Sequence, residues 1–260
     1  MIALIAALQL EIQPLLRRLD GIDRHRVGGF PVALGQFAGK PVVVCQSGLG
    51  RRAGEASQLV LERYRPQAAV SFGVAGALSP QLRAGDIVLC ERVCSAARPN
   101  AGALSCDSSL LAAAQKAGEE TRMRVTVGSA LTLGHVAATP AAKAGLAEST
   151  GLDIVEMEGH WVAQAAQAAG VPFLAVRAVL DEAADALPEI PGFVDGDGRT
   201  HRLRLLPYLV RRPLALPALI RLAGKERHAV QNLGRFMEAF VASLDGSLAG
   251  SPVTLSARAS

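Results

Sequence analysis

The chain has 260 residues, of which 50% are hydrophobic and 19% are charged, and its formal net charge is +4. This length is enough for one α/β domain with a sizeable core, and the composition excludes an intrinsically disordered chain. The N-terminal run MIALIAALQL has no preceding basic segment, and no stretch reaches the ~18 uninterrupted apolar residues that a spanning helix needs. We therefore expect a cytoplasmic protein. The four cysteines lack the spacing of a zinc site, so no metal is expected.

Apolar strands and helices alternate through the first half of the chain. Ile2–Leu8 is a continuous apolar run, which is typical of a strand buried on both faces. The elements expected after it are a helix at Ile12–Leu19, strands at Pro31–Leu34 and Pro41–Gln46, a helix at Arg52–Tyr64, strands at Ala68–Phe72 and Asp86–Cys94, and a helix at Ser108–Ala117.

The same alternation continues in the second half. The expected elements are a strand at Arg124–Thr132, a helix at Ala141–Ser149, a strand beginning at Ile154–Met157, a helix at Trp161–Ala169 and a strand at Pro172–Val179. Strands that alternate with helices predict a central, largely parallel mixed sheet with helices on both faces. We expect this α/β domain to span residues 1–200.

The segment after residue 200 differs in composition. Residues 201–248 are rich in arginine and leucine, which predicts a helical, basic extension of the same domain. Pro207, Pro213 and Pro217 are expected to split it into helical pieces. These pieces are Leu203–Val210, Pro213–Leu222 and Ala229–Leu244. Residues 249–260 are small and polar, and we expect a flexible tail.

Small residues follow a buried strand at Ser71–Leu78, with the sequence SFGVAGAL. Glycine and alanine let a ligand approach the backbone, and ligand sites of open α/β sheets lie at the carboxyl ends of strands. Glu11 stands at the end of the first strand. The glycine-rich segment also fits an ordinary tight turn, and Glu11 also fits a surface position, so neither feature alone identifies a site.

Charged residues stand at the ends of two later strands. The segment VEMEG places Glu156 and Glu158 directly after a predicted strand. Arg177 lies within the apolar segment PFLAVRAVLD and needs a carboxylate partner, which either glutamate can supply. Asp181 ends that segment, where it can reach a pocket. Helix capping is the alternative for these acids, because carboxylates are favoured near helix N-termini.

Taken together, these segments resemble one family. In chain order they are Glu11, SGLG at 47–50, GVAGAL at 73–78 with GDIV at 85–88, VEMEG at 155–159 and PFLAVRAVLD at 172–181. The series is similar to the 5′-methylthioadenosine/S-adenosylhomocysteine nucleosidases and purine nucleoside phosphorylases. The resemblance covers residues 1–185. It implies a three-layer phosphorylase-type fold, a homo-oligomer and cleavage of an N-glycosidic bond that releases adenine.

The resemblance implies two catalytic residues. Glu11 corresponds to the acid that activates water, and Asp181 to the acid that protonates the purine at N7. These residue types suit the chemistry, because positive charge builds on the ribose during cleavage and the leaving purine needs a proton.

The resemblance also implies a set of substrate-binding residues. Met157 and Glu158 correspond to the ribose-binding pair, and Arg177 to the arginine that braces Glu156 and Glu158. The remaining expected contacts are Val74, Ala75, Gly76, His135 and Val136. The expected partner is thus a small nucleoside, and no nucleic acid is expected.

Several positions depart from the family pattern. Leu180 replaces the serine that usually precedes the catalytic aspartate, and Val74 stands where a serine or threonine often contacts sugar or phosphate. The GDPxR loop of the phosphorylase branch is missing, and Ser71 occupies the place of its arginine. These differences favour water over phosphate as the nucleophile. The residues of a possible anion or water site are Ser47, Gly48 and Arg51. Phosphate therefore remains open as a co-substrate, and no other cofactor is expected.

The extension carries a second, weaker resemblance. The stretch LLPYLVRRPLALPALIRLA at 205–223 is similar to the extension of the hopanoid-associated phosphorylase subgroup, which is associated with removal of adenine from adenosylhopane. This implies a lipid-linked substrate and peripheral contact with an acidic membrane surface. An amphipathic helix that covers the core is the alternative. A nucleoside-binding protein without turnover, motivated by Leu180 and Val74, also stays open, as does a membrane-peripheral protein.

Overall fold

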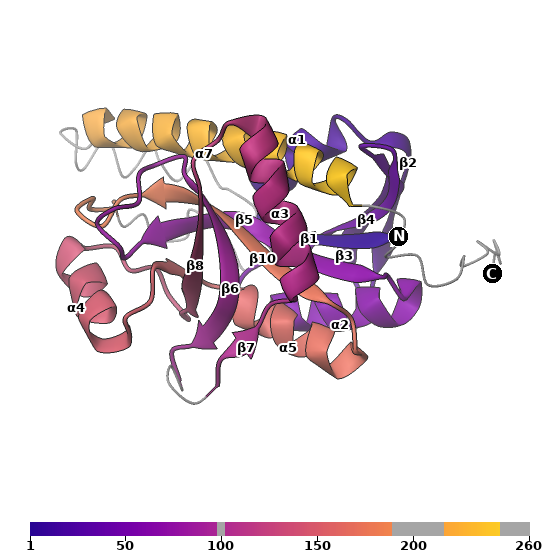
Figure 1. Cartoon of the computed structure of the whole chain (residues 1–260), viewed down its shortest axis with the longest axis horizontal. Helices are drawn as coiled ribbons and strands as arrows, with labels where there is room; N and C mark the ends of the chain where they lie inside the picture. The colour runs from indigo at the N-terminus through magenta and orange to yellow at the C-terminus, as the bar shows by residue number, and fades with distance from the viewer. Residues whose placement is uncertain (98–101, 189–215, 245–260) are drawn as a thin grey trace.

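The computed structural model describes residues 1–97, 102–188 and 216–244 (Figure 1). The strands are β1 Ile2–Ala6, β2 Asp20–Val27, β3 Phe30–Phe37, β4 Lys40–Gln46, β5 Ala68–Ala77, β6 Ile87–Ser95, β7 Leu104–Ser105, β8 Val125–Thr132, β9 Ile154–Glu156 and β10 Phe173–Asp181. The helices are α1 Gln9–Leu16, α2 Arg52–Tyr64, α3 Ser108–Thr121, α4 Pro140–Thr150, α5 Gly159–Ala169 and α7 Leu216–Ser243.

A single mixed sheet joins these strands in the order β10-β6-β8-β9-β5-β1-β4-β3-β2, with β7 attached to β6. Because β10 also pairs with β5, the strands β5, β10, β6, β8 and β9 close into a ring. Among the described strands, β1 pairs in parallel with β4 and β5, β10 with β5, and β8 with β6 and β9. The other pairings are antiparallel, so the α/β fold with a mixed sheet is confirmed, with parallel pairing in half of it.

Helices cover both faces of the sheet (Figure 1). Alternate residues of β1 point to opposite faces: Ile2 and Leu4 pack in one core cluster, and Ala3 and Ile5 in another. The first cluster includes residues of α1, α3 and α7, and the second includes residues of α2 and α5. A smaller cluster under α4 lies at one end of the molecule. The expected three-layer arrangement is confirmed.

The structure corrects several of the expected elements. Strand β2 (Asp20–Val27) was not expected, because nearly all of its residues are exposed and its sequence lacks apolar alternation. Helix α1 begins at Gln9 rather than residue 12, because Glu11 accepts the amide of Leu8 and thereby caps the helix start. Strand β5 continues through the glycines to Ala77, so that segment is strand and not a tight turn.

The extension also differs from expectation where it is described. Residues 216–243 form the single helix α7, and Pro217 lies in its first turn, where a proline is tolerated because that amide has no helical partner. The pieces expected at 203–210 and before residue 216, and the tail at 249–260, lie outside the described residues. Within the described parts of the chain, no helix is long and apolar enough to cross a membrane.

Candidate active site

Strand β5 is the platform on which the two predicted catalytic acids meet the backbone. It pairs in parallel with β1, which leads into α1 and Glu11, and with β10, which ends at Asp181. A Cβ atom added to Gly73 would lie 2.7 Å from Oε1 of Glu11, and one added to Gly76 would lie 3.2 Å from Oδ2 of Asp181. The glycines therefore allow the two carboxyl groups to approach one strand, about 10 Å apart along it.

Glu11 is a buried carboxyl that backbone amides hold on both sides. Its side chain accepts the amide of Leu8 at Oε2 (2.8 Å) and the amide of Val74 at Oε1 (2.9 Å). Only 4% of the residue is exposed. Burial raises the pKa of Glu11 to about 6, although the amides and the charge of Arg177 oppose this. A carboxyl that titrates near neutral pH can act as a general base.

Arg177 and Glu156 form a buried ion pair, and their remaining hydrogen bonds go to other protein groups. Nη2 of Arg177 donates to Oε2 of Glu156 (2.7 Å) and to the hydroxyl of Ser71 (2.8 Å), and Nη1 donates to the carbonyl of Ser71 (2.8 Å). The expectation that a glutamate of VEMEG partners Arg177 is confirmed.

Protein groups engage both carboxylate oxygens of Glu156. Oε1 accepts the hydroxyl of Thr132, and Oε2 also accepts the amides of Glu158 (3.0 Å) and Gly159 (2.6 Å). These amides belong to the start of α5, so Glu156 caps that helix while it pairs with Arg177. Glu156 is thus a bracing residue.

Glu158, by contrast, faces the cavity. Its Oε1 accepts the amide of Gly50 at 3.0 Å, and within the described residues no hydrogen bond reaches Oε2. Burial and, after it, the neighbouring charge of Glu156 raise the pKa of Glu158 to about 8. The two glutamates of VEMEG therefore differ: protein groups engage both oxygens of Glu156, whereas within the described residues they engage one oxygen of Glu158.

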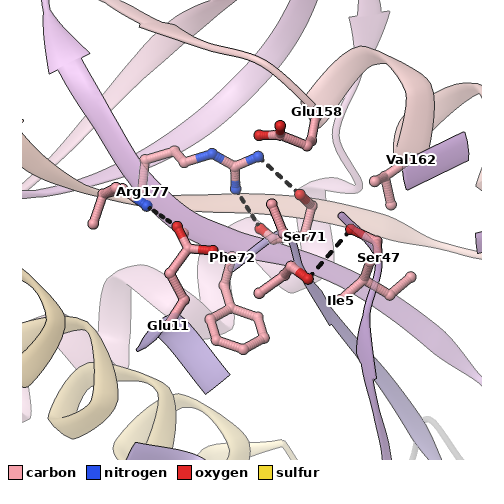
Figure 2. Close-up of a pocket in the computed structure, with 12 residues that line it drawn as sticks. Ile5, Glu11, Ser47, Ser71, Phe72, Glu158, Val162 and Arg177 are labelled. Carbon is pink, nitrogen blue, oxygen red and sulfur yellow. Dashed lines mark hydrogen bonds between the residues drawn. The ribbon is translucent and has the colours of Figure 1, made fainter. Parts of the chain in front are cut away.

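A small cavity of about 10 Å³ joins these groups, which is room for about one water molecule. In Figure 2, Glu11 and Glu158 lie on either side of the Arg177 side chain, with Ser71 beside the guanidinium. The residues that line the cavity are Ile5, Ala6, Ala7, Glu11, Ser47, Ser71, Phe72, Gly73, Val74, Glu158, Val162 and Arg177. Two carboxyl groups and a cation thus surround one water-sized space.

Asp181 occupies the opposite end of the platform. Its residue partner on β5 is Gly76, whereas Val179 pairs with Ala75, so Leu180 is the extra residue of a bulge. A bulge of this kind re-aims the side chain that follows it. Asp181 is 2% exposed, and burial raises its pKa although an ion pair with the buried Lys143 opposes the change.

Other predicted site residues lie elsewhere. His135 and Val136 are exposed and line a separate, open cavity of about 390 Å³ against α4, not the Glu11 cavity. Arg51 is exposed and stacks on Trp161, with 4.7 Å between its guanidinium carbon and the ring centre. Ser47 lines the Glu11 cavity, and Gly48 is buried beside it. His135 and Val136 thus line a different cavity from the glutamates, and Arg51 contacts Trp161.

The predicted residues of the platform are partly buried around the same strand. Val74 and Gly76 are half-buried, Ala75 is buried, and Met157 is half-buried between the two glutamates of its segment. Within the described residues, no group of three or more His, Cys, Asp or Glu side chains is placed to hold a metal ion.

Three polar contributors were missed from the sequence. Ser71 anchors Arg177, Thr132 bonds Glu156, and Lys143 pairs with Asp181. Ser71 belongs to the segment SFGVAGAL, but it was considered only because it occupies the place of the arginine of the phosphorylase branch. Thr132 and Lys143 had no local signal, because their partners are 24 and 38 residues away.

Comparison with known proteins shows the family of the chain. The family model described as "Phosphorylase superfamily" matches residues 1–202. The chain belongs to the phosphorylase superfamily. Among curated members it is similar to the 5′-methylthioadenosine/S-adenosylhomocysteine nucleosidase of Shewanella halifaxensis (29% identity, covering 72% of this chain and 88% of the relative) and to that of Bacillus thuringiensis (30%, 69% and 85%).

Solved members of the superfamily share the fold. The nucleosidase of Neisseria meningitidis in complex with methylthio-immucillin-A superposes with a TM-score of 0.75 at 21% identity, covering 94% of this chain and 99% of that one. The futalosine hydrolase of Helicobacter pylori superposes with a TM-score of 0.74 at 19% identity, covering 94% and 97%. At these identities, the superpositions establish the phosphorylase-type fold.

Proposed function

We propose that this nucleosidase-like chain hydrolyses the N-glycosidic bond of a 5′-substituted adenosine and releases adenine. Glu11 would act as general base for the attacking water, and Asp181 as general acid for the purine. The observation that carries this proposal is the water-sized cavity beside Glu11. Burial of Glu11 raises its pKa to about 6. A base with that pKa is ionised at neutral pH and can accept a proton from water.

The remaining groups of the cavity suit a developing ribosyl cation. Glu158 has an unoccupied carboxyl oxygen that can bond the sugar hydroxyls, and its raised pKa lets it donate as well as accept. Ionised Glu11 would also stabilise positive charge on the sugar as the bond to the base breaks. Arg177 keeps the site from holding an uncompensated excess of negative charge.

The geometry favours water over phosphate as nucleophile. A space of about 10 Å³ beside Glu11 has room for a water molecule. The arginine predicted to hold an anion, Arg51, stacks on Trp161 instead. Phosphorolysis therefore ranks second.

The names of the relatives support the substrate class. The curated relatives are nucleosidases of 5′-methylthioadenosine and S-adenosylhomocysteine, so these thioether nucleosides are our first candidates. Adenosylhopane is the finer candidate. It rests on the resemblance of residues 205–223, most of which lie outside the described residues. A homo-oligomer, a cytoplasmic location and membrane contact through the extension stay predictions.

The test is release of free adenine. Purified protein is incubated with 5′-methylthioadenosine, S-adenosylhomocysteine or adenosylhopane, each with and without phosphate, and adenine is measured by chromatography. Release from the thioethers without phosphate, and its loss in Glu11→Gln, would support the proposal. Release only from the lipid-linked nucleoside would identify the larger substituent. Strict dependence on phosphate would replace hydrolysis with phosphorolysis, and no adenine from any substrate would contradict the proposal.

A further inference from the structure

Lys143 is a fully buried cation that the mechanism above does not use. Its side chain is 0% exposed and lies near the start of α4. Lysine is almost never fully buried unless it is paired, because the desolvated charge is costly. A buried lysine near Asp181 therefore needs an ion-pair partner or hydrogen-bond acceptors.

All three donors of the Lys143 ammonium are engaged. An ammonium has three N–H donors and no acceptor. Nζ donates to Oδ2 of Asp181, to the carbonyl of Glu182 at 2.8 Å and to the carbonyl of Asp185 at 3.0 Å. These acceptors all belong to the end of β10 and the loop after it. Lys143 thus ties α4 to the segment that presents Asp181.

The contact leaves one oxygen of Asp181 available. Lys143 engages Oδ2, and within residues 1–97, 102–188 and 216–244 no hydrogen bond reaches Oδ1. Because Asp181 follows the bulge at Leu180, the ladder of β5 and β10 alone does not fix the direction of its side chain. Leu180 also has no hydroxyl with which to hold the carboxyl. Lys143 is the side chain that does so among the described residues.

We propose, resting on the proposed function, that Lys143 is a positioning residue for the general acid. It holds the carboxyl of Asp181 through Oδ2 and presents Oδ1 to the leaving purine. Lys143 does not touch the reacting atoms and acts only through Asp181.

The charged groups around Asp181 come from three elements. Lys143 on α4 and Lys225 on α7 lower its pKa, and Asp185 in the loop after β10 raises it. Lys225 bonds Asp185 at 2.5 Å, and Glu182 in the same loop faces Arg83 at 3.6 Å. Removal of Lys143 should therefore raise the pKa of Asp181, whereas removal of Lys225 acts mainly on Asp185.

The experiment compares Lys143→Met, which keeps the length of the side chain, with Lys143→Arg and the control Lys225→Met. Lys225→Met removes the other lysine that anchors this loop but leaves Asp181 paired. The pKa of Asp181 is measured by ¹³C-carboxyl NMR, with Asp181→Asn to assign the signal. Adenine release is measured as kcat and KM across pH. Folding of each variant is checked by circular dichroism.

We expect Lys143→Met to raise the pKa of Asp181 by about 1 to 3 units. It should lower kcat by ~10- to 100-fold with KM changed less than ~3-fold, because a misplaced acid slows the chemistry more than binding. The alkaline limb of the kcat profile should move to higher pH, since Asp181 must be protonated to donate. Lys143→Arg should recover most of the rate. Lys225→Met should raise the pKa of Asp181 much less than Lys143→Met does and leave kcat nearly unchanged.

Two results would overturn the inference. One is a folded Lys143→Met protein with unchanged Asp181 pKa and kcat. The other is an equal loss of kcat when Lys143→Met is made in the Asp181→Asn background, where a positioning residue should add less than ~2-fold. If Lys143→Met alone does not fold, the double variant, which removes both charges, is compared with Asp181→Asn, and the ratio of their kcat values decides the question.

The two proposals fail separately. If the wild type releases no adenine but Lys143→Met shifts the Asp181 titration, the proposed function is wrong and the coupling of Lys143 to Asp181 stands. If the wild type releases adenine and the titration does not shift, the positioning role is wrong and the proposed function stands.

Discussion

The two ends of the β5 platform bury a carboxyl group in different ways. At the Glu11 end, two backbone amides hold the carboxyl, and the nearest cation, Arg177, bonds Glu156 and Ser71 instead. At the Asp181 end, a buried lysine pairs directly with the carboxyl. Neutral dipoles hold Glu11 in place while leaving its proton exchangeable near neutral pH. An ammonium holds Asp181 by charge, and opposes the effect of burial on its pKa.

At both ends burial raises the pKa of the carboxyl, and the groups that hold the carboxyl in place lower it. For Glu11 the result is a pKa of about 6. The two ends therefore differ in the kind of group that opposes burial, and the following changes test each end in turn.

The largest expected effect comes from removing the titratable group at the Glu11 end. Glu11→Gln keeps the shape of the side chain but cannot accept a proton, so kcat should fall by ~10³-fold. In the wild type, kcat/KM should rise with pH through about pH 6 as Glu11 ionises, and this limb should disappear in the variant. A pH profile of adenine release measures both. Retention of the limb in Glu11→Gln would assign it to another group.

The next effect tests whether Arg177 stabilises the fold through its ion pair with Glu156. Arg177→Met leaves the Glu156 carboxylate buried without its cation, which should lower the free energy of unfolding by about 3 to 5 kcal/mol. Urea denaturation measures this. The matched control is Arg177→Met with Glu156→Gln, which removes both charges and should recover part of the loss. No recovery would show that Arg177 stabilises the fold through its bonds to Ser71 rather than through the ion pair.

Glycine substitutions in β5 displace the carboxyl group at one end of the platform or at the other. An alanine Cβ at position 73 would lie 2.7 Å from Glu11, and one at position 76 would lie 3.2 Å from Asp181. Gly73→Ala should therefore lower kcat/KM by ~100-fold and Gly76→Ala by ~10-fold, since small displacements of reacting groups are costly. Gly224→Ala, where nothing lies within 4 Å of the added atom, is the control. The reverse order of effects would contradict the comparison.

The smallest effect concerns stability and pH. The pKa of Glu11 is raised from 4.5 to about 6, so its protonated form favours the fold. That stabilisation is full below pH 4.5 and is lost as pH rises through 6, to a total of about 2 kcal/mol. Glu11→Gln does not titrate. Its free energy of unfolding relative to the wild type should therefore improve by that amount between pH 4 and pH 8, measured by denaturation at each pH.

Much of the fold could be predicted from the sequence because buried strands and amphipathic helices leave local patterns. Helix Arg52–Tyr64 was predicted at its observed bounds, and the apolar strands were placed within a few residues. Strand β2 was missed because it is an exposed edge strand whose partner, not its own composition, makes it a strand. Pro217 was predicted to break the extension, whereas it lies within α7, the single helix that residues 216–243 form.

The site was predictable in part for the same reason. Glu11, Glu158 and Asp181 end strands or follow them, Arg177 lies within β10, and the sheet brings these strands together. The difference in hydrogen bonding between Glu156 and Glu158 was not predictable, because it depends on Thr132 and the amides of α5. Lys143 on its helix looks like any surface lysine until its contact with β10 is known.

The last helix has a consequence for synthesis of the protein. Residues of α7 from 229 to 241 share one core cluster with Ile2 and Leu4 of β1, and Phe236 and Phe240 are fully buried in it. The core around β1 is therefore not closed until α7, which lies far downstream in the chain, has been synthesised. Until then the face of the sheet beneath α7 stays exposed and prone to association, so this chain should depend on chaperones until α7 has been synthesised.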